Sequence, residues 1–162
     1  MTFDELMTDF ASTLDVRDPK TDGGTGTRTF AFDGNWVDFR PDATARAVVM
    51  TAQIGALPGG DAGAMLMRVL LSANFLRQGT AGLAVLGIDA KKDMCCLRRR
   101  DSLALLDGKA YAAVVEEFLD ILEMWQRRLA DVSSLAGTIA DFRSEQVAES
   151  RSRLLGDGLI RV

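Results

Sequence analysis

The first residues of the chain carry apolar side chains at the spacing of one helix face. Acidic residues and threonines fill most of the positions between them. This period predicts an amphipathic helix over about residues 3–14, with one side turned towards a core. The apolar positions are Phe3, Leu6, Met7, Phe10, Ala11 and Leu14. The next run, DPKTDGGTGT at 18–27, is typical of a loop.

Three strand-like runs follow, and turn-forming residues separate them. The runs at 27–34 and 35–40 meet at Asp33-Gly34, a pair that favours a tight hairpin turn. The run at 45–55 is apolar on both faces, as expected of a central strand. Together the three runs predict an antiparallel meander.

The segment at 62–76 predicts a helix that is apolar on nearly every side. Its polar residues, Arg68, Ser72 and Asn74, form no broad face towards solvent. Such a helix is buried on two sides. One side can pack on the sheet of the same chain, and we expect the other to contact a second subunit.

The rest of the chain predicts a second hairpin, from runs at 82–90 and 93–103, and a long amphipathic helix at about 109–129. Periodicity is weaker beyond, where a partial helix is expected over about 138–155. The elements predict an α+β fold in the order α-β-β-β-α-β-β-α, with a five-stranded antiparallel sheet and three helices. We expect one domain over 1–130 and a partly helical tail over 131–162.

Composition narrows the classes of function. The 162 residues are 48% hydrophobic and 26% charged, and the net charge of −4 argues against a nucleic-acid binder or a polybasic membrane-surface protein. The chain has no histidine, which excludes histidine catalysis and histidine metal sites. The adjacent Cys95 and Cys96 fit two reduced thiols. With no signal peptide and no long apolar run, we expect a cytoplasmic protein without a cofactor or metal.

Three features could carry chemistry, and each has a simpler interpretation. The glycines of Asp22–Thr27 precede a strand rather than a helix, which favours a flexible loop over a phosphate cradle. Strand alternation places Cys95 and Cys96 on opposite faces, which favours packing over redox chemistry. It also divides the basic run Arg98–Arg100 between faces, so these side chains either pair with acids on the last helix or contact a partner. The sequence therefore does not predict an enzyme.

Four segments in this order resemble the type III secretion chaperones of the Tir-chaperone family. They read TFAFDGNWVDFR, IGALPGG, LLSANFLRQGTAGLAVLGID and CCLRRRDSLALL, and the resemblance covers about residues 3–130. The most telling part joins the apolar helix to the next strand, from Leu71 through Gly79 to Asp89. No segment is catalytic; the ordered combination carries the resemblance.

The resemblance implies a cytoplasmic homodimer that binds a nonglobular segment near the N-terminus of a secreted effector and keeps it soluble and export-competent without ATP. It implies a dimer contact on the helix at 62–76, aided by the strands after Gly82. It implies a client surface on the first helix and the meander. The dimer candidates are Met65, Leu66, Val69, Leu70 and Ala73, and the effector-binding candidates are Leu6, Phe10, Phe30, Phe32, Trp36 and Phe39.

Two other functions stay open at this point. A protein of the same fold could act as a regulator that sequesters a transcriptional activator or another secretion component. A small enzyme or ligand-binding domain could use Gly23–Thr27 or Cys95. The sequence does not identify the client, and it does not settle which apolar strand residues face a client rather than the core.

Overall fold

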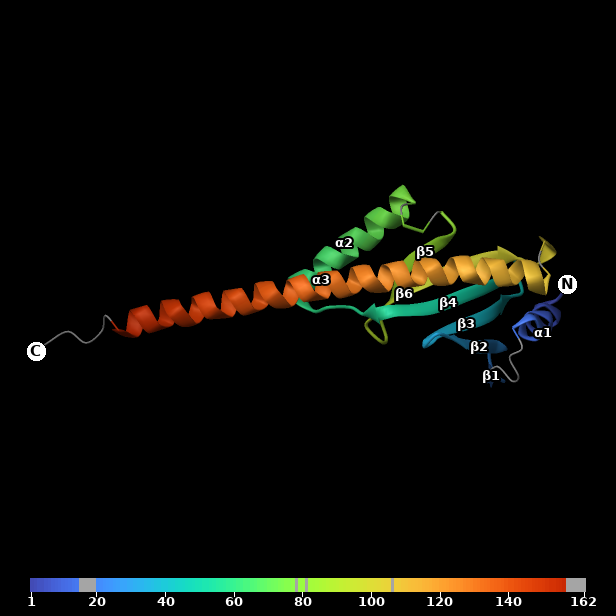
Figure 1. Ribbon diagram of the computed structural model, residues 1–162, viewed down its shortest axis with the longest axis horizontal. Helices are drawn as coiled ribbons and strands as arrows, with labels where there is room; N and C mark the ends of the chain where they lie inside the picture. The colour runs from blue at the N-terminus through green and yellow to red at the C-terminus, as the bar shows by residue number, and fades with distance from the viewer. Residues whose placement is uncertain (15–19, 78, 81, 106, 157–162) are drawn as a thin grey trace, which may run out of the picture.

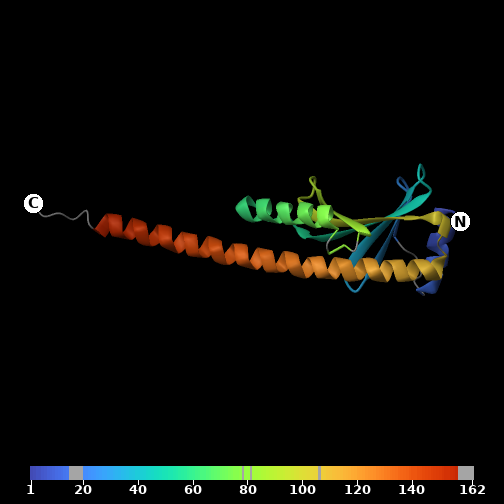
Figure 2. The same cartoon turned by 90° about the horizontal axis from the view of Figure 1, so that it is seen from above.

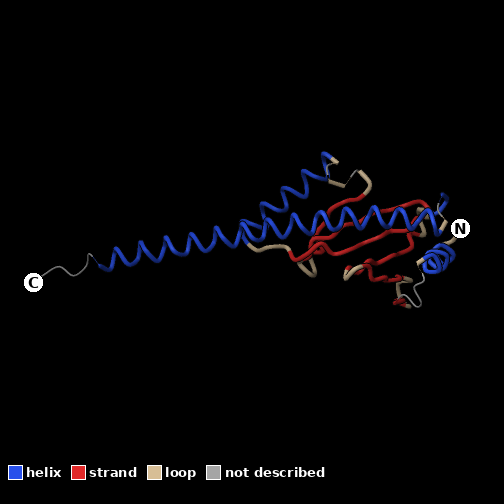
Figure 3. Tube along the Cα trace, viewed as in Figure 1, coloured by secondary structure: helices blue, strands red, loops and turns tan. Residues whose placement is uncertain are grey.

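The computed structural model describes residues 1–14, 20–77, 79–80, 82–105 and 107–156. Three helices and six strands make up this part of the chain, together with a short 3₁₀ helix (Figures 1 and 3). In chain order they are α1 (Phe3–Thr13), β1 (Lys20–Asp22), β2 (Thr27–Phe32), β3 (Asn35–Asp42), β4 (Ala47–Ala56), α2 (Gly60–Leu76), β5 (Ala84–Asp89), β6 (Met94–Ser102), η1 (Leu103–Leu105) and α3 (Gly108–Gly156).

All strands belong to one antiparallel sheet with the order β1-β2-β3-β4-β6-β5. The predicted α+β class with three helices is confirmed, but the prediction of five strands is wrong. The additional strand, β1, lies in the run that was expected to be a loop. Its three polar residues are all exposed and pair with β2 alone, so no hydrophobic alternation marks them as a strand.

The tight turn between β2 and β3 forms where the sequence predicts it. Asp33 and Gly34 both have positive φ, 45° and 85°, the backbone region required at both central positions of a type I′ hairpin turn. This turn sets the β2–β3 register, with Phe30 opposite Val37. The register places Phe30 and Phe39 on the same face of the sheet.

α1 and α3 cover that face, and α1 is fixed at both of its ends. A capping box closes its N-terminus, where the Glu5 N–H donates to Thr2 Oγ1 and the Thr2 N–H donates to Glu5 Oε2. Towards its other end the Asp9 carboxylate accepts a 2.6 Å hydrogen bond from the Gly108 N–H, at the start of α3. The two helices therefore meet at the N-terminus of α3.

An aromatic cluster lies beneath the two helices; we define it as Phe10, Phe30, Phe39 and Tyr111. Its rings meet mostly edge to face, with centroids 5.3 Å apart for Phe30 and Phe39 and 5.5 Å apart for Phe10 and Tyr111. All four side chains are buried. The Tyr111 hydroxyl has no hydrogen-bond partner among the described residues, and burial raises the pKa of this phenol.

α3 is one continuous helix rather than a helix followed by a separate partial one. It runs from Gly108 to Gly156, through the region near residues 130–137 where a break was expected. Figure 2 shows that its second half projects well past the sheet. Ser133, Ser134 and Gly137 are weak helix formers but do not end the helix. Their low helix propensity costs little free energy compared with the total for a long helix. The last residues of the expected tail, 157–162, lie outside the described part of the chain.

α2 lies along the outer edge of β5 and closes part of it. The Asn74 side chain donates to the Leu86 carbonyl oxygen at 2.8 Å and accepts from the Leu86 N–H at 2.9 Å. These two backbone groups point away from β6, where a further strand would pair with them. After α2, the Trp125 indole N–H donates to the Gly79 carbonyl oxygen at 2.8 Å, which ties the α2–β5 connection to α3.

Candidate protein-binding surfaces

The outward-facing half of α2, the connection after it and the neighbouring strand β5 expose large apolar side chains; we call these residues together the α2–β5 surface. Phe75 is 86% exposed and Leu71 is 69% exposed, although both belong to a regular helix. A monomeric soluble protein seldom leaves so many large apolar groups in water on neighbouring elements. The residues of the surface are Met65, Met67, Val69, Leu71, Phe75, Leu76, Leu83, Val85 and Ile88.

The predicted dimer candidates divide between the two sides of α2. Met65, which is 64% exposed, and Val69 lie on the α2–β5 surface. Leu66, Leu70 and Ala73 are buried in the core of their own chain, so their placement at a subunit contact is corrected here. The reason is the phase of the helix. Positions 66, 70 and 73 form one narrow stripe, and a helix that is apolar all round gives no sequence signal for which stripe faces inwards.

Leu71 and Phe75, the most exposed apolar residues of α2, were therefore missing from the dimer candidates. The only sequence signal for them is that α2 carries more apolar residues than one buried stripe requires. That signal indicates a second contact, but it does not say on which side of the helix the contact lies.

The effector-binding candidates also divide. Leu6, Phe10, Phe30 and Phe39 are buried with the chain's own core residues, so they offer no surface to a client, and their assignment is corrected. Leu6 and Phe10 lie on the inner side of α1, and they pack with the apolar stripe of α3 over Phe30 and Phe39 on one face of the sheet. Phe32 is half-buried beside the aromatic cluster, and Trp36 is 53% exposed on the opposite face of the sheet. These two remain available for contact.

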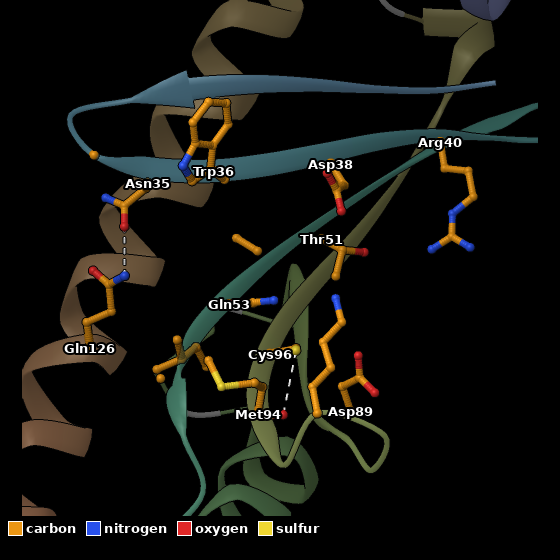
Figure 4. A pocket seen from close by; sticks show the side chains of 15 residues that line it. Asn35, Trp36, Asp38, Arg40, Thr51, Gln53, Asp89, Met94, Cys96 and Gln126 are labelled. Carbon is orange, nitrogen blue, oxygen red and sulfur yellow. Dashed lines mark hydrogen bonds between the residues drawn. The ribbon is translucent and has the colours of Figure 1, made fainter. Parts of the chain in front are cut away.

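The open face of the sheet, opposite α1 and α3, is hollowed; we call this hollow the sheet-face cavity. Its volume is about 640 Å³, and its lining comes mainly from β3, β4 and β6, with Asp89 at the end of β5, Lys92 in the β5–β6 turn and Gln126 of α3 (Figure 4). A 2.7 Å hydrogen bond between Gln126 of α3 and Asn35 closes one end. The central lining residues are Trp36, Asp38, Arg40, Thr51, Gln53 and Cys96.

The basic run separates as the alternation of strand residues predicts. Arg99 is buried on the core side, where it donates to Asp101 at 3.0 Å and to Glu117 of α3 at 2.7 Å. The prediction of a pair with an acid on the last helix is confirmed for this arginine. Arg98 and Arg100 lie on the open face, and Arg100 pairs with Asp42 at 2.9 Å.

The glycine-rich loop and the two cysteines, which could carry catalysis, have local environments that do not favour it. In the glycine-rich loop the Asp22 carboxylate accepts from the Gly24 N–H and the Thr25 hydroxyl, which places a negative charge where a phosphate would need donors. Burial raises the pKa of both cysteine thiols, so they are protonated and weakly nucleophilic near neutral pH. Among the described residues, no group of His, Cys, Asp and Glu side chains is arranged to hold a metal ion.

A different question is whether the long helices could enter a lipid bilayer. Within the described ranges, no helix combines the length and the apolar composition needed to cross a membrane.

Comparison with known proteins gives a family match. The model of the family described as Tir chaperone protein (CesT) matches residues 5–126, three quarters of the chain. None of the curated protein sequences compared with the chain matches it.

Several solved structures share the fold. A chain of the ExsC–ExsE complex has 22% identity and a TM-score of 0.65, and the match covers 80% of this chain and 97% of that one. A chain of the HopA1–SchA chaperone–effector complex has 17% identity and a TM-score of 0.63, with 77% and 93% covered. The Yersinia pestis type III secretion chaperone SycH, in complex with a stable fragment of YscM2, has 20% identity and a TM-score of 0.59, with 76% and 99% covered.

Proposed function

Because the chain belongs to the Tir chaperone protein (CesT) family, we propose that it is a cytoplasmic type III secretion chaperone. It binds the nonglobular N-terminal region of a secreted effector and keeps this region soluble and competent for export. The observation that carries the proposal is the family match, which extends from α1 into the body of α3. The function needs binding alone, so neither ATP nor a catalytic group enters the mechanism.

The proposal includes a homodimer formed through the α2–β5 surface. Its support is the exposure of Leu71, Phe75 and Met65 on neighbouring turns of one helix. Burying these side chains against a second copy removes apolar area from water, which favours association by roughly 25 cal/mol for each Å². Two-fold symmetry lets one such surface serve both subunits, because each copy presents the same residues to the other.

Client binding is proposed at the opposite edge of the sheet, on β1 and the neighbouring strands. β1 pairs with β2 only, and within the described residues no strand covers its outer edge. An extended client segment can pair with such an edge through its main chain, which tolerates different sequences. Phe32 and Trp36 provide apolar contacts nearby, and a large contact area offsets the entropy lost by a disordered client.

The test is to isolate the tagged chain from its own cells, with secretion switched on, and to treat the purified complex with protease. We expect a near-stoichiometric partner that is protected over an N-terminal stretch of roughly 50–100 residues, as for a wrapped disordered segment. The protected fragment is then made recombinantly and titrated against wild type, Trp36→Ala and the exposed control Lys91→Ala. Only Trp36→Ala should weaken binding.

Other outcomes separate the remaining functions. A folded regulator or another secretion component as the bound partner would favour the sequestering role. The absence of any stoichiometric protein partner would contradict the chaperone proposal.

A further inference from the structure

The open face of the sheet carries arginine charges that no residue in the described part of the chain pairs with. Arg40 of β3 and Arg98 of β6 are both exposed on this face, with β4 between them. Neither forms an ion pair with a residue that the structure describes. An unpaired guanidinium presents up to five N–H donors in a fixed planar arrangement that suits a carboxylate.

Asp38, Asp42 and Asp89 are acids on the same face, and each accepts a hydrogen bond from a nearby residue. Asp38 accepts a 2.7 Å hydrogen bond from the Thr29 hydroxyl. Asp42 accepts from the Thr44 hydroxyl at 2.7 Å and pairs with Arg100, and the Thr44 bond is the main reason that its pKa lies below the ordinary value. Around the sheet-face cavity the basic side chains Arg40, Arg98, Arg100 and Lys92 outnumber Asp38, Asp42 and Asp89, so the balance among these groups is cationic.

Arg40 and Arg98 both lie at the sheet-face cavity. Arg40 lines it, and Arg98 is the direct cross-strand neighbour of another lining residue, Thr51. At its end near the β2–β3 turn, the exposed Trp36 ring provides an apolar platform, with the Lys20 ammonium 4.3 Å from the ring centroid. The hollow thus joins an aromatic surface to several cationic groups.

Charge elsewhere on the molecule directs an acidic partner to this face. The helical side carries exposed acids on α1 and on the outer surface of α3, and the whole chain has a net charge of −4. An acidic segment is repelled by the helices and attracted by Arg40 and Arg98. A nucleic acid, which carries charge along its whole length, would face the same repelling acids over a larger area. The acids are Asp4, Glu5, Asp9, Glu116, Asp120 and Glu123, of which Asp4 pairs with Arg28 and Glu123 pairs with Arg127.

We propose that the sheet-face cavity binds an extended, carboxylate-bearing segment of the client, whose Asp or Glu side chains pair with Arg40 and Arg98 while an apolar residue packs on Trp36. This inference rests on the proposed function, since it names the chemistry of one client segment. It adds a site on the face of the sheet that is distinct from strand pairing at the β1 edge.

The test uses two fluorescein-labelled 12-residue peptides, one with Glu and one with Gln at alternate positions, and titrates both into the full chain. We expect the Glu peptide to bind at least about tenfold more tightly, with an affinity that falls as salt rises. The double variant R40E/R98E should remove this difference. The control K109E/R127E changes the net charge equally on the helical side and should bind as wild type does.

Further arms keep the result decisive. R40Q/R98Q removes the charges without adding acids, and it should also lose the difference between the peptides if the reversed variant folds poorly. Equal binding of the Glu and Gln peptides to wild type, or tighter binding of a 12-nucleotide single strand, would overturn the inference.

The proposed function can fail separately. If the isolated client fragment binds R40E/R98E as tightly as wild type, the chaperone proposal stands and this site is refuted. If wild type isolates no client, the chaperone proposal fails whatever the peptides do.

Discussion

The aromatic cluster and the α2–β5 surface are both rich in large apolar side chains, and they differ in what covers them. α1 and α3 enclose the cluster, so Phe10, Phe30 and Phe39 lose their contact with water when one chain folds. Leu71 and Phe75 keep most of theirs. Apolar area in the first region stabilises the folded chain, whereas apolar area in the second remains available to stabilise an assembly. A substitution should therefore lower folding stability in one region and association in the other.

The largest expected effect is in the aromatic cluster. Phe39→Ala removes a fully buried ring and should lower the free energy of unfolding by about 3–5 kcal/mol, measured by urea denaturation. Trp36→Ala is the matched control, because Trp36 lies on the same strand but faces outwards, and we expect a loss of about 1 kcal/mol or less. Similar losses for the two variants would contradict the assignment of the faces of β3.

The next effect separates the two sides of α2. Leu66→Ala should lower the free energy of unfolding by about 2–4 kcal/mol, because Leu66 is buried against the chain's own core. Met65→Ala changes the adjacent, exposed position and should change that free energy by less than about 1 kcal/mol. Denaturation at several protein concentrations distinguishes loss of folding from loss of association. A larger loss for Met65→Ala would mean that the helix is rotated.

The α2–β5 surface is tested through association. Leu71→Glu places a charge at the exposed apolar surface and should weaken the proposed homodimer about 30-fold, or about 2 kcal/mol, in analytical ultracentrifugation. The control Ala113→Glu adds the same charge at an exposed position of α3 and should leave the dimer unchanged. If wild type sediments as a monomer at all concentrations, the α2–β5 surface has another occupant.

Asn74 links α2 to β5 and should have a smaller effect. Asn74→Ala removes both side-chain hydrogen bonds to Leu86 and should lower the free energy of unfolding by about 1.5 kcal/mol. Hydrogen exchange gives the specific signature, because the Leu86 amide should exchange faster while the amides of β3 keep their protection. Unchanged protection at Leu86 would show that these bonds do not persist in solution.

The smallest expected effect is a pH-dependent change in folding stability. It acts at the N-terminus of α1, the helix that contributes Phe10 to the aromatic cluster. The hydrogen bond from the Thr2 N–H lowers the pKa of Glu5 below its ordinary 4.5, so the ionised carboxylate stabilises the start of the helix. This contribution is fully present above pH 4.5 and is lost as the pH falls through the lowered pKa. Glu5→Gln should flatten this part of a melting-temperature profile. An identical acid profile for the variant would assign the acid sensitivity to other groups.

Local patterns predict much of this fold, because they act over few residues. The 3.6-residue period of α1 and the Asp33-Gly34 turn each contain their own structural reason, and both form as expected. β1 escapes prediction because three polar residues carry no period. The continuity of α3 escapes it because Ser133, Ser134 and Gly137 favour a break that the rest of the helix overrides.

The candidate site was less predictable than the fold, because it depends on what covers each residue. Phe39 and Trp36 are both aromatic and lie on one strand, and only the packing of α1 and α3 on one face of the sheet decides that Phe39 is buried. Leu66 and Leu71 are equally apolar on one helix, and only the contact of α2 with the rest of the chain distinguishes them. Arg40 and Arg98 are far apart in the sequence. Only the pairing of β3 and β6 with β4 brings the two arginines to the same face of the sheet.

The hydrogen bonds between Asn74 and Leu86 also limit where the sheet can recruit a further strand. Because the Asn74 amide occupies both outward backbone groups of Leu86, a further strand cannot pair with β5 at this residue. A continuous ladder between copies through their β5 edges would have to displace this side chain, which disfavours growth of a fibre from this edge. One amide side chain thereby protects the middle of β5 from strand addition, whereas no described strand or side-chain amide occupies the outer edge of β1.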